Sequence, residues 1–282
     1  FTLGIVASAM SSMFVSCSKE RIEDPSLKQY KSLNEYFDSK KQKEQEFIID
    51  SGGIPPIVGE QGTRIWPSKS AIMFTNGDSV KWPYTVKLIE LYTPKDMIYY
   101  QQATAAAGVL LNDDGQIKLR AFKDNEQLQF KAGASWKVEM PNKKPQSDMK
   151  LRYGNNEGTL INWNLNSDGD FANTDTSYIG QIGQFGWSTC AKLNATSPKY
   201  AKISFTSSTD DLLNVGIFIY LPTQKTLVQV FDQNSIDLPV GETARIILIG
   251  IDSGNKLYAY YKEMSIDTTN TIDVTLTEIS ET

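Results

Sequence analysis

From residue 51 onward the chain consists of short runs that alternate apolar and polar residues, and this pattern restricts the fold more than any other feature. Residues 86–92 and 117–122 alternate with a period of two, as strands with one solvated face do. Such runs follow one another at spacings of roughly 8–12 residues, and no convincing helix interrupts them. The sequence therefore predicts an all-β protein built of β-sandwiches.

Turn and linker signals divide this series of strands. Asn76-Gly77 and Asp114-Gly115 stand between apolar runs and are typical of hairpin turns. Residues 141–147 contain two prolines among polar residues, which is typical of a linker. The chain is also longer than the usual single domain. We therefore expect two sandwiches in tandem, over residues 49–142 and 149–282.

An amphipathic helix is expected before the strands, over residues 26–46. Ser26 is a plausible N-cap, and apolar residues recur at three- and four-residue steps along one face. This stripe consists of Leu27, Tyr30, Leu33, Tyr36 and Phe37. The stripe favours a helix packed on its own sandwich or on a bilayer surface, and docking to a partner is the alternative.

The first 16 residues are uncharged, small or apolar, and Cys17 with a charged segment follows them. A bilayer core needs about 20 apolar residues, so this run is too short to span one and has the length of a secretory h-region. Phe14-Val-Ser-Cys17 resembles the lipobox of bacterial lipoproteins, which implies an acylated thiol at Cys17. A plain signal peptide with an incidental cysteine is the alternative. We expect a signal peptide over 1–16 and a lipid anchor, spacer and helix over 17–48.

The chain has no histidine, which excludes histidine-activated nucleophiles and histidine-ligated zinc. A net charge of -5 argues against nucleic acid as a partner. If Cys17 is acylated, Cys190 has no cysteine left to pair with, and we expect it to be a buried, inert thiol. We predict that the protein is not an enzyme.

A polar loop partly fits a calcium-binding pattern, because oxygen donors fall at alternate positions around a glycine. The first ligand would be Asn rather than Asp, and the twelfth Asp rather than Glu. Asx turns explain the same residues, so we expect no cofactor and keep calcium as an alternative. The candidate ligands are Asn164, Asn166, Asp168, Asp170 and Asp175.

Aromatic and acidic residues suggest two further kinds of site. The five tryptophans and the cluster of Tyr258, Tyr260 and Tyr261 could stack on sugars, although sandwich cores routinely contain such residues. Asp113-Asp114 and Asp210-Asp211 fall where turns are expected, so loop solubility accounts for them. A carboxylate-based hydrolase would instead need two acids that converge in one cleft.

Residues 57–141 resemble a pattern found in Bacteroidetes lipoproteins and in the ZU-type β-sandwich of ankyrins, netrin receptors and zonula-occludens proteins. The resemblance implies a structural or protein-interaction module without an active site. Some eukaryotic relatives cleave themselves beside a histidine, and that activity cannot apply to this chain. The matching positions are Pro67, Ala71, Gly77, Val86, Glu90, Asp96, Met97, Thr104, Gly108, Leu111 and Gly115.

Residues 149–282 are similar to the C-terminal parts of the same lipoproteins. Relatives often carry an acidic residue after the Gly-Trp pair, where this chain has Thr189-Cys190, so a role of that acid cannot be carried over to this chain. The matching segments are 151–154 (LRYG), 161–163 (INW), 186–187 (GW) and 238–241 (LPVG).

These observations lead to one main expectation. The protein is expected to be a non-catalytic lipoprotein, held by lipid at Cys17 on the outer membrane, facing the periplasm or the cell surface. Its sandwiches would form a structural or protein-interaction module with an envelope or surface protein as partner. A glycan-binding lipoprotein of a nutrient-uptake system is the first alternative, and a carboxylate-based hydrolase is the second.

Overall fold

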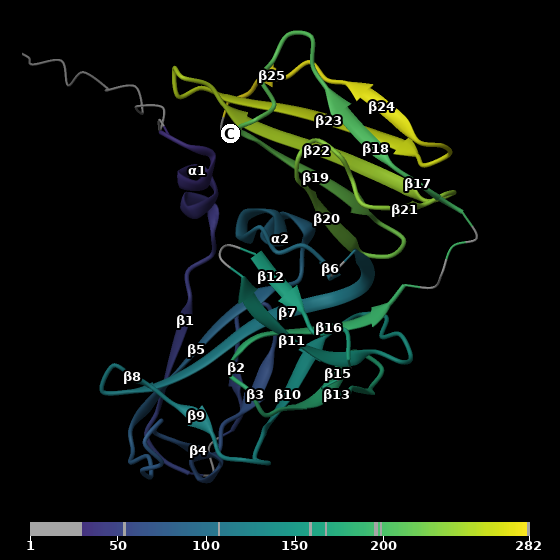
Figure 1. Cartoon of the computed structure of the whole chain (residues 1–282). Coiled ribbons are helices and arrows are strands. Elements are labelled where there is room, and N and C mark those ends of the chain that lie inside the picture. The colour runs from purple at the N-terminus through teal and green to yellow at the C-terminus, as the bar shows by residue number, and fades with distance from the viewer. Residues whose placement is uncertain are drawn as a thin grey trace, which may run out of the picture.

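The computed structural model describes residues 30–52, 55–106, 108–157, 160–166, 168–194, 197 and 199–280 (Figure 1). Strands dominate these residues. The α-helices among them are two short ones, α1 (Leu33–Lys40) and α2 (Pro94–Tyr100). The expected all-β class is therefore confirmed. None of the helices in these ranges is long and apolar enough to cross a membrane.

Two antiparallel sheets form the first sandwich, in the lower half of Figure 1. The longer sheet, called here the central sheet, has the order β1 (Gln45–Ile49), β5 (Tyr84–Leu91), β7 (Val109–Lys123), β16 (Gly186–Leu193), β11 (Lys150–Glu157) and β12 (Leu160–Trp163). The facing sheet has the order β14 (Ala172–Asn173), β15 (Ser177–Ile182), β10 (Trp136–Pro141), β3 (Arg64–Trp66) and β2 (Ile57–Val58). Shorter strands extend these sheets or pair beside them: β4 (Ile72–Met73), β6 (Ala105–Ala106), β8 (Glu126–Gln127), β9 (Gln129–Phe130) and β13 (Gly169–Asp170).

Alternation along the strands explains the core between these two sheets. Val86 and Leu88 on β5 point inward with Ile117 and Leu119 on β7, and all four side chains are buried. Trp136 on β10 closes the core from the facing sheet. Residues one position along, such as Lys87, point the other way, as the pleat of a strand requires.

A second sandwich-like unit follows, in the upper half of Figure 1. On β19, Ile217 and Ile219 face its core, while Phe218 faces the opposite side. Its main antiparallel sheet has the order β20 (Thr226–Val230), β19 (Val215–Leu221), β22 (Thr243–Ile251), β23 (Leu257–Ser265) and β25 (Thr277–Glu278). Two strand pairs complete the unit: β17 (Tyr200–Ala201) with β21 (Leu238–Pro239), and the parallel pair β18 (Ile203–Thr206) with β24 (Asn270–Asp273).

The expected boundary between residues 142 and 149 is not where the strands divide. β10 pairs with β15 in the facing sheet, and β7 pairs with β16 in the central sheet, so strands from both sides of the expected linker share both sheets. The first sandwich therefore runs from Gln45 to Leu193, and residues 149–193 belong to it. The loop of residues 142–149 carries the chain from one sheet to the other, which is why it is exposed, polar and proline-containing like a linker.

A third apolar cluster joins the two sandwiches. It fills the space between the outer face of the central sheet and the outer face of the β20–β19–β22–β23 sheet. Trp163 and Trp187 come from the first of these faces, and Phe218 and Leu227 from the second. Helices α1 and α2 lie in the same layer (Figure 1). Both sandwiches therefore bury a second face against each other and against these helices.

Helix α1 is shorter than the predicted helix over 26–46. Ser32, not Ser26, is the N-cap, and its Oγ accepts a hydrogen bond from the backbone N–H of Glu35 at 3.2 Å. Lys41 adopts an extended conformation, and β1 begins at Gln45 because that segment pairs with β5 instead. Tyr36 and Phe37 are buried in the third cluster. The interpretation that the helix packs on its own protein is confirmed for the described residues.

One of the two predicted turns is correct. At Asn76-Gly77 the backbone N–H of Gly77 donates to the carbonyl of Phe74 at 3.0 Å, and Met73 bridges Ser79 across the turn. Asp114-Gly115 is not a hairpin turn but lies inside the long strand β7. The register with β16 shifts there, and Gly115 has a φ of 141°, so the site is a β-bulge. Hairpin turns and β-bulges both favour a glycine with a positive φ, so the Asp-Gly pair alone does not distinguish them.

Candidate binding cavity

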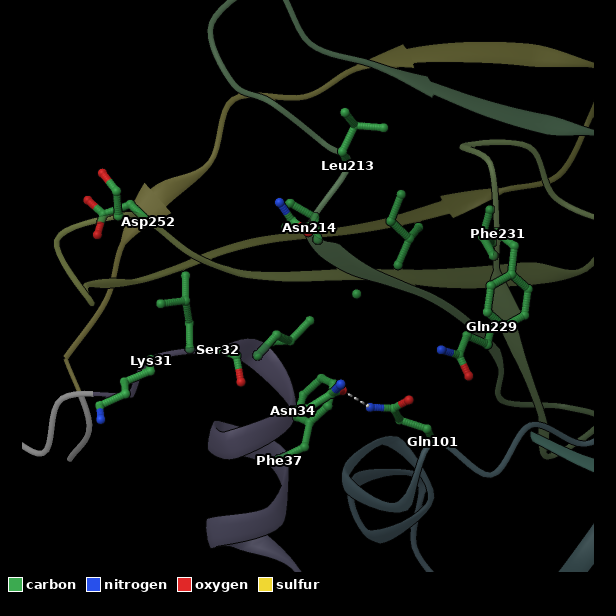
Figure 2. A pocket seen from close by; sticks show the side chains of 17 residues that line it. Lys31, Ser32, Asn34, Phe37, Gln101, Leu213, Asn214, Gln229, Phe231 and Asp252 are labelled. Atoms are coloured by element: carbon green, nitrogen blue, oxygen red, sulfur yellow. Dashed lines mark hydrogen bonds between the residues drawn. The ribbon is translucent and has the colours of Figure 1, made fainter. Parts of the chain in front are cut away.

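A cavity of about 610 Å³ opens between α1 and the end of the second sandwich. We call it the α1 cavity, and Figure 2 shows it from close by. The first turn of α1 forms one wall, with Gln101 after α2 beside it. The start of β19, the end of β20 and the turn between β22 and β23 form the rest. The cavity thus uses elements from both ends of the chain.

The lining of the α1 cavity mixes apolar and neutral polar side chains and carries little charge. Only Lys31 and Asp252 among the lining residues carry a charge. The Nε2 of Gln101 donates to the Oδ1 of Asn34 at 2.9 Å, which ties α1 to the end of α2 (Figure 2). The neutral polar residues that line the cavity are Ser32, Asn34, Gln101, Asn214, Gln229 and Ser253.

Two of these amides have no partner in the described part of the chain. Gln229 alternates on β20 with the core residues Val228 and Val230, so its side chain points away from the second core and toward the cavity (Figure 2). Its Oε1 is buried and accepts no hydrogen bond. Asn214 lies just before β19; its side chain also forms no hydrogen bond with described residues, but the residue is exposed to solvent, so of the two amides only that of Gln229 is buried without a partner. Unpaired buried polar atoms are rare in folded proteins.

Two apolar side chains are exposed at this cavity. Leu213 is 80% exposed and Phe231 is 51% exposed, although their neighbours Leu212 and Val230 are buried. The backbone N–H of Leu213 donates to the Oδ1 of Asp211 at 2.9 Å, which fixes the turn that presents this leucine. The lining therefore combines unpaired amides with exposed apolar surface.

A smaller cavity of about 460 Å³ adjoins the first and shares the wall from Asn214 to Val215 and from Ile251 to Ser253. Its far side carries Asp210, whose Oδ2 accepts hydrogen bonds from the backbone of Leu276 at 3.0 Å and the hydroxyl of Thr209 at 2.8 Å. These bonds lower the pKa of Asp210. Its carboxylate therefore fixes a loop, and the edge of the combined groove is acidic.

A third cavity, of about 670 Å³, lies where α2, the β7 bulge, residues 141–144 and the β19–β20 turn meet. The Asp114 side chain here is 0% exposed and forms an ion pair with Lys225 of the second sandwich. It also accepts a hydrogen bond from the hydroxyl of Tyr178, on the facing sheet. Asp114 thus connects three layers of the molecule, and we call this set of contacts the Asp114 junction.

Asp113 is bonded within its own strand. Its Oδ1 accepts the backbone N–H of Gly115 at 2.6 Å, and its Oδ2 accepts the Nε2 of Gln116 at 2.8 Å. Burial outweighs these bonds and raises the pKa of Asp113 to about 6. Asp113 and Asp114 were expected in a solvated turn, and instead both are buried in the bulge. Each is satisfied by protein groups, and they point to different partners.

The expected lipidation residue, Cys17, lies outside the described residues. Cys190 is described, buried and free, and burial raises the pKa of its thiol well above the usual range. The expectation of a buried thiol at Cys190 is confirmed.

The calcium-loop candidates are not brought together around one point. Asp168 accepts the backbone N–H of Tyr153 at 2.9 Å and the Nδ2 of Asn164 at 3.0 Å, and Asn164 in turn accepts the backbone N–H of Asn166. The bond from Asn166 to Asn164 spans two residues and is an Asx turn, as in the alternative explanation of this loop, and the bond from Tyr153 to Asp168 ties the loop to β11. The remaining two candidates lie apart from these bonds: Asp170 pairs with Lys150 on the neighbouring strand β11, and Asp175 lies in the turn between β14 and β15.

Three of the five tryptophans are buried, and the tyrosines of the predicted cluster are half-buried or exposed. Trp136, Trp163 and Trp187 are buried in the first and third clusters. Tyr260 packs against the second core, while Tyr261 is 62% exposed on the other side of β23. Phe231, which the sequence analysis did not single out, is the aromatic residue that lines the α1 cavity with an exposed ring.

No protein family, curated protein or solved structure compared with this chain matches it. The site is therefore defined by its geometry alone. Sequence reasoning missed Leu213, Asn214, Gln229 and Phe231, because they come from different elements and share no motif. Exposed apolar residues next to strand ends were the only local signal.

Proposed function

We propose that this chain is a non-catalytic, lipid-anchored binding module of the bacterial cell envelope, with the α1 cavity as its binding surface. The observation that carries the proposal is that this cavity combines the buried, unpaired amide oxygen of Gln229 with the exposed apolar side chains of Leu213 and Phe231. Groups without partners in the folded chain are available to a ligand. Tandem β-sandwiches of the ZU type and an outer-membrane address are part of the same proposal.

The carboxylates support a binding role over a hydrolytic one. Asp114 is paired with Lys225 and Tyr178, and Glu90 accepts backbone N–H groups of Gln61 and Thr63, each at 2.9 Å. Acids bonded in this way hold turns and layers together. A carboxylate-based hydrolase would instead need two unpaired carboxylates that converge on a substrate.

The position of α1 fits an anchor at Cys17. A fully extended chain spans at most about 3.5 Å per residue, so the segment 17–30 reaches no more than about 45 Å. The described chain enters at Tyr30, next to Lys31 in the wall of the cavity. Lipid at Cys17 would therefore keep the cavity close to the membrane surface.

Metabolic labelling tests the anchor. The gene is expressed with its natural leader in a bacterium grown with radiolabelled palmitate, and the purified chain is examined for label. We expect label on the unchanged chain, and we expect Cys17→Ala to abolish both the label and the recovery in the membrane fraction.

Cys190→Ala is the matched control, because it removes the other cysteine and should leave the label unchanged. Label that persists in Cys17→Ala, or a Cys17→Ala chain that remains in the membrane fraction, would contradict the anchor.

A further inference from the structure

We propose that the α1 cavity binds a neutral oligosaccharide, with Phe231 as the stacking surface and with Gln229 and Asn214 as hydroxyl-binding groups. This inference rests on the proposed function, because it gives a ligand class to the same cavity. It does not depend on how the chain is held at a membrane.

The unpaired amides favour hydroxyl groups as ligands. A side-chain amide offers two N–H donors and one carbonyl acceptor in one plane, and each sugar hydroxyl can both donate and accept. The Oε1 of Gln229 is buried without a donor, and Figure 2 shows this side chain directed into the cavity. Rotation about the last torsion of Gln229 presents either atom of its amide to a ligand. A bound hydroxyl would satisfy a group that the chain itself leaves unpaired.

The exposed ring favours a ligand with an apolar face. Phe231 leaves about half of its surface in water at the end of β20, and Leu213 lies at the same cavity. A pyranose ring has a face of C–H groups that packs on an aromatic ring, while its hydroxyls point outward to polar partners. Binding would remove apolar surface of Phe231 from water, which is favourable.

The charge of the groove favours a neutral sugar over an acidic one. Asp210, Asp211 and Asp252 line the adjoining cavity, and no lysine or arginine does. An acidic sugar would face these carboxylates without a counter-charge. Among the described residues that line the α1 cavity, Lys31 is the one basic residue and Asp252 the one acidic residue.

The size favours several linked sugars. Ligand sites commonly have volumes of about 300–1,000 Å³, and the α1 cavity lies within that range. The adjoining cavity continues it along the shared wall from Ile251 to Ser253. A linear oligosaccharide could occupy both.

A protein partner fits the same lining less well. Protein interfaces bury about 800 Å² per partner and have an apolar core. In the described lining, Leu213 and Phe231 are the large apolar side chains with strong exposure, and the other apolar residues are buried or half-buried. We therefore treat a protein ligand as an outcome of the test.

Calorimetric titration of the purified full chain tests the inference. A detergent without sugar groups, such as an amine oxide, avoids competition from the detergent. The probes are linear hexasaccharides of glucose, mannose, xylose and galactose, with oligogalacturonate as the acidic comparison. We expect at least one neutral hexasaccharide to bind with a Kd below about 1 mM, and oligogalacturonate to bind more weakly.

The variants locate the site. Phe231→Ala should weaken binding by at least about tenfold, and Gln229→Ala and Asn214→Ala should weaken it severalfold. Tyr261→Ala is the matched control, because Tyr261 is a comparably exposed aromatic residue outside the cavity lining, and it should leave the Kd unchanged. Circular dichroism of each variant confirms that it is folded.

Three results would overturn the inference: no binding by any neutral hexasaccharide, tighter binding of oligogalacturonate, or equal losses in Phe231→Ala and Tyr261→Ala. A protein retained by the immobilised chain and lost with Phe231→Ala, in the absence of sugar binding, would identify a protein surface instead. Palmitate labelling at Cys17 is independent of all these readouts, so failure of the anchor and failure of the sugar site are distinguishable.

Discussion

The Asp114 junction and the α1 cavity both lie where the second sandwich meets the rest of the chain, yet they use polar residues in opposite ways. At the junction, Asp114 is fully buried and bonded to Tyr178 and Lys225. At the cavity, the Oε1 of Gln229 is buried without a partner, and the Phe231 ring is half exposed. The polar groups of the junction stabilise the fold, whereas the unpaired amide at the cavity remains available to a ligand.

This difference teaches how to separate structural from functional polar residues by their hydrogen-bond partners alone. Burial alone does not separate them, because both regions contain buried polar atoms. The hydrogen-bond partners do: a group satisfied by its own chain has a structural role, and an unsatisfied one beside a cavity calls for a ligand. Substitutions in the two regions should therefore have opposite effects on stability.

The largest effect is expected at the junction. Asp114→Ala leaves the buried hydroxyl of Tyr178 and the cation of Lys225 without their acceptor, and it should lower the free energy of unfolding by about 4 kcal/mol. Urea unfolding followed by tryptophan fluorescence at pH 7 measures this loss. Asp175→Ala, an exposed control, should change the free energy by less than about 0.5 kcal/mol. Equal losses in the two variants would contradict a structural role for the junction.

The next effect depends on pH. The pKa of Asp113 is about 6 in the folded chain, above its usual 3.8, so the folded state holds the proton more tightly than the unfolded state. The contribution of Asp113 to stability is therefore greatest below about pH 4 and is lost as the pH rises to about 6, by about 3 kcal/mol. Asp113→Asn removes the charge, and the unpaired Oε1 of Gln116 can accept from the new amide.

We therefore expect Asp113→Asn to be more stable than the unchanged chain at pH 7, with a difference that shrinks toward pH 4. Urea unfolding at several pH values between these limits measures it. Parallel stability profiles for the two chains would show that Asp113 does not titrate in this window.

A smaller effect of opposite sign to that of Asp114→Ala is expected in the α1 cavity. Gln229→Leu removes a buried acceptor that has no donor, and it should raise the free energy of unfolding by about 1 kcal/mol. The same variant should lose affinity for the oligosaccharide. A gain in stability with a loss of binding is the pattern expected of a ligand site. Thermal unfolding and titration of one preparation measure both, and a loss of stability would place Gln229 among the structural residues.

The smallest effect is expected at the loop that partly fits a calcium pattern. The oxygens of Asp168 and Asn164 already accept hydrogen bonds, as do those of the junction. Calcium at about 1 mM should therefore shift the Tm by less than about 1 °C relative to a chelator. A rise of several degrees that Asp168→Asn abolishes would mean that calcium displaces these bonds.

Local pattern was enough to place many strands. The alternation over residues 86–92 and 117–122 corresponds to β5 and to part of β7. These strands were predictable because one face packs on a core, and their side chains report that face directly.

The pairing of the strands was not predictable in the same way. Residues 142–149 are polar and proline-containing both as a loop between two sheets and as a linker between two domains, so composition alone could not distinguish the two. The pairing of β10 with β15 distinguishes the two, because it joins Trp136 to Ile182, which lies 46 positions further along the chain. The bulge at Gly115 was not predicted, because only its pairing with the distant strand β16 distinguishes a bulge from a turn.

The candidate site was the least predictable part. Asn214, Gln229 and Phe231 acquire meaning only when α1 is placed against the second sandwich, and no spacing in the chain encodes that placement. Buried residues leave a periodic signal in the sequence, whereas an unpaired amide at a cavity looks like any other surface glutamine.

The third apolar cluster has a consequence for how this chain can evolve. Because the central sheet and the β20–β19–β22–β23 sheet each bury their outer faces there, neither half would be soluble and intact if the chain were divided between Asn194 and Tyr200. Helix α1 contributes Tyr36 and Phe37 to the same layer, so its loss would expose both halves together. Exchange of either half into another protein would need a new covering for that face, and we expect the two halves to be inherited as one unit.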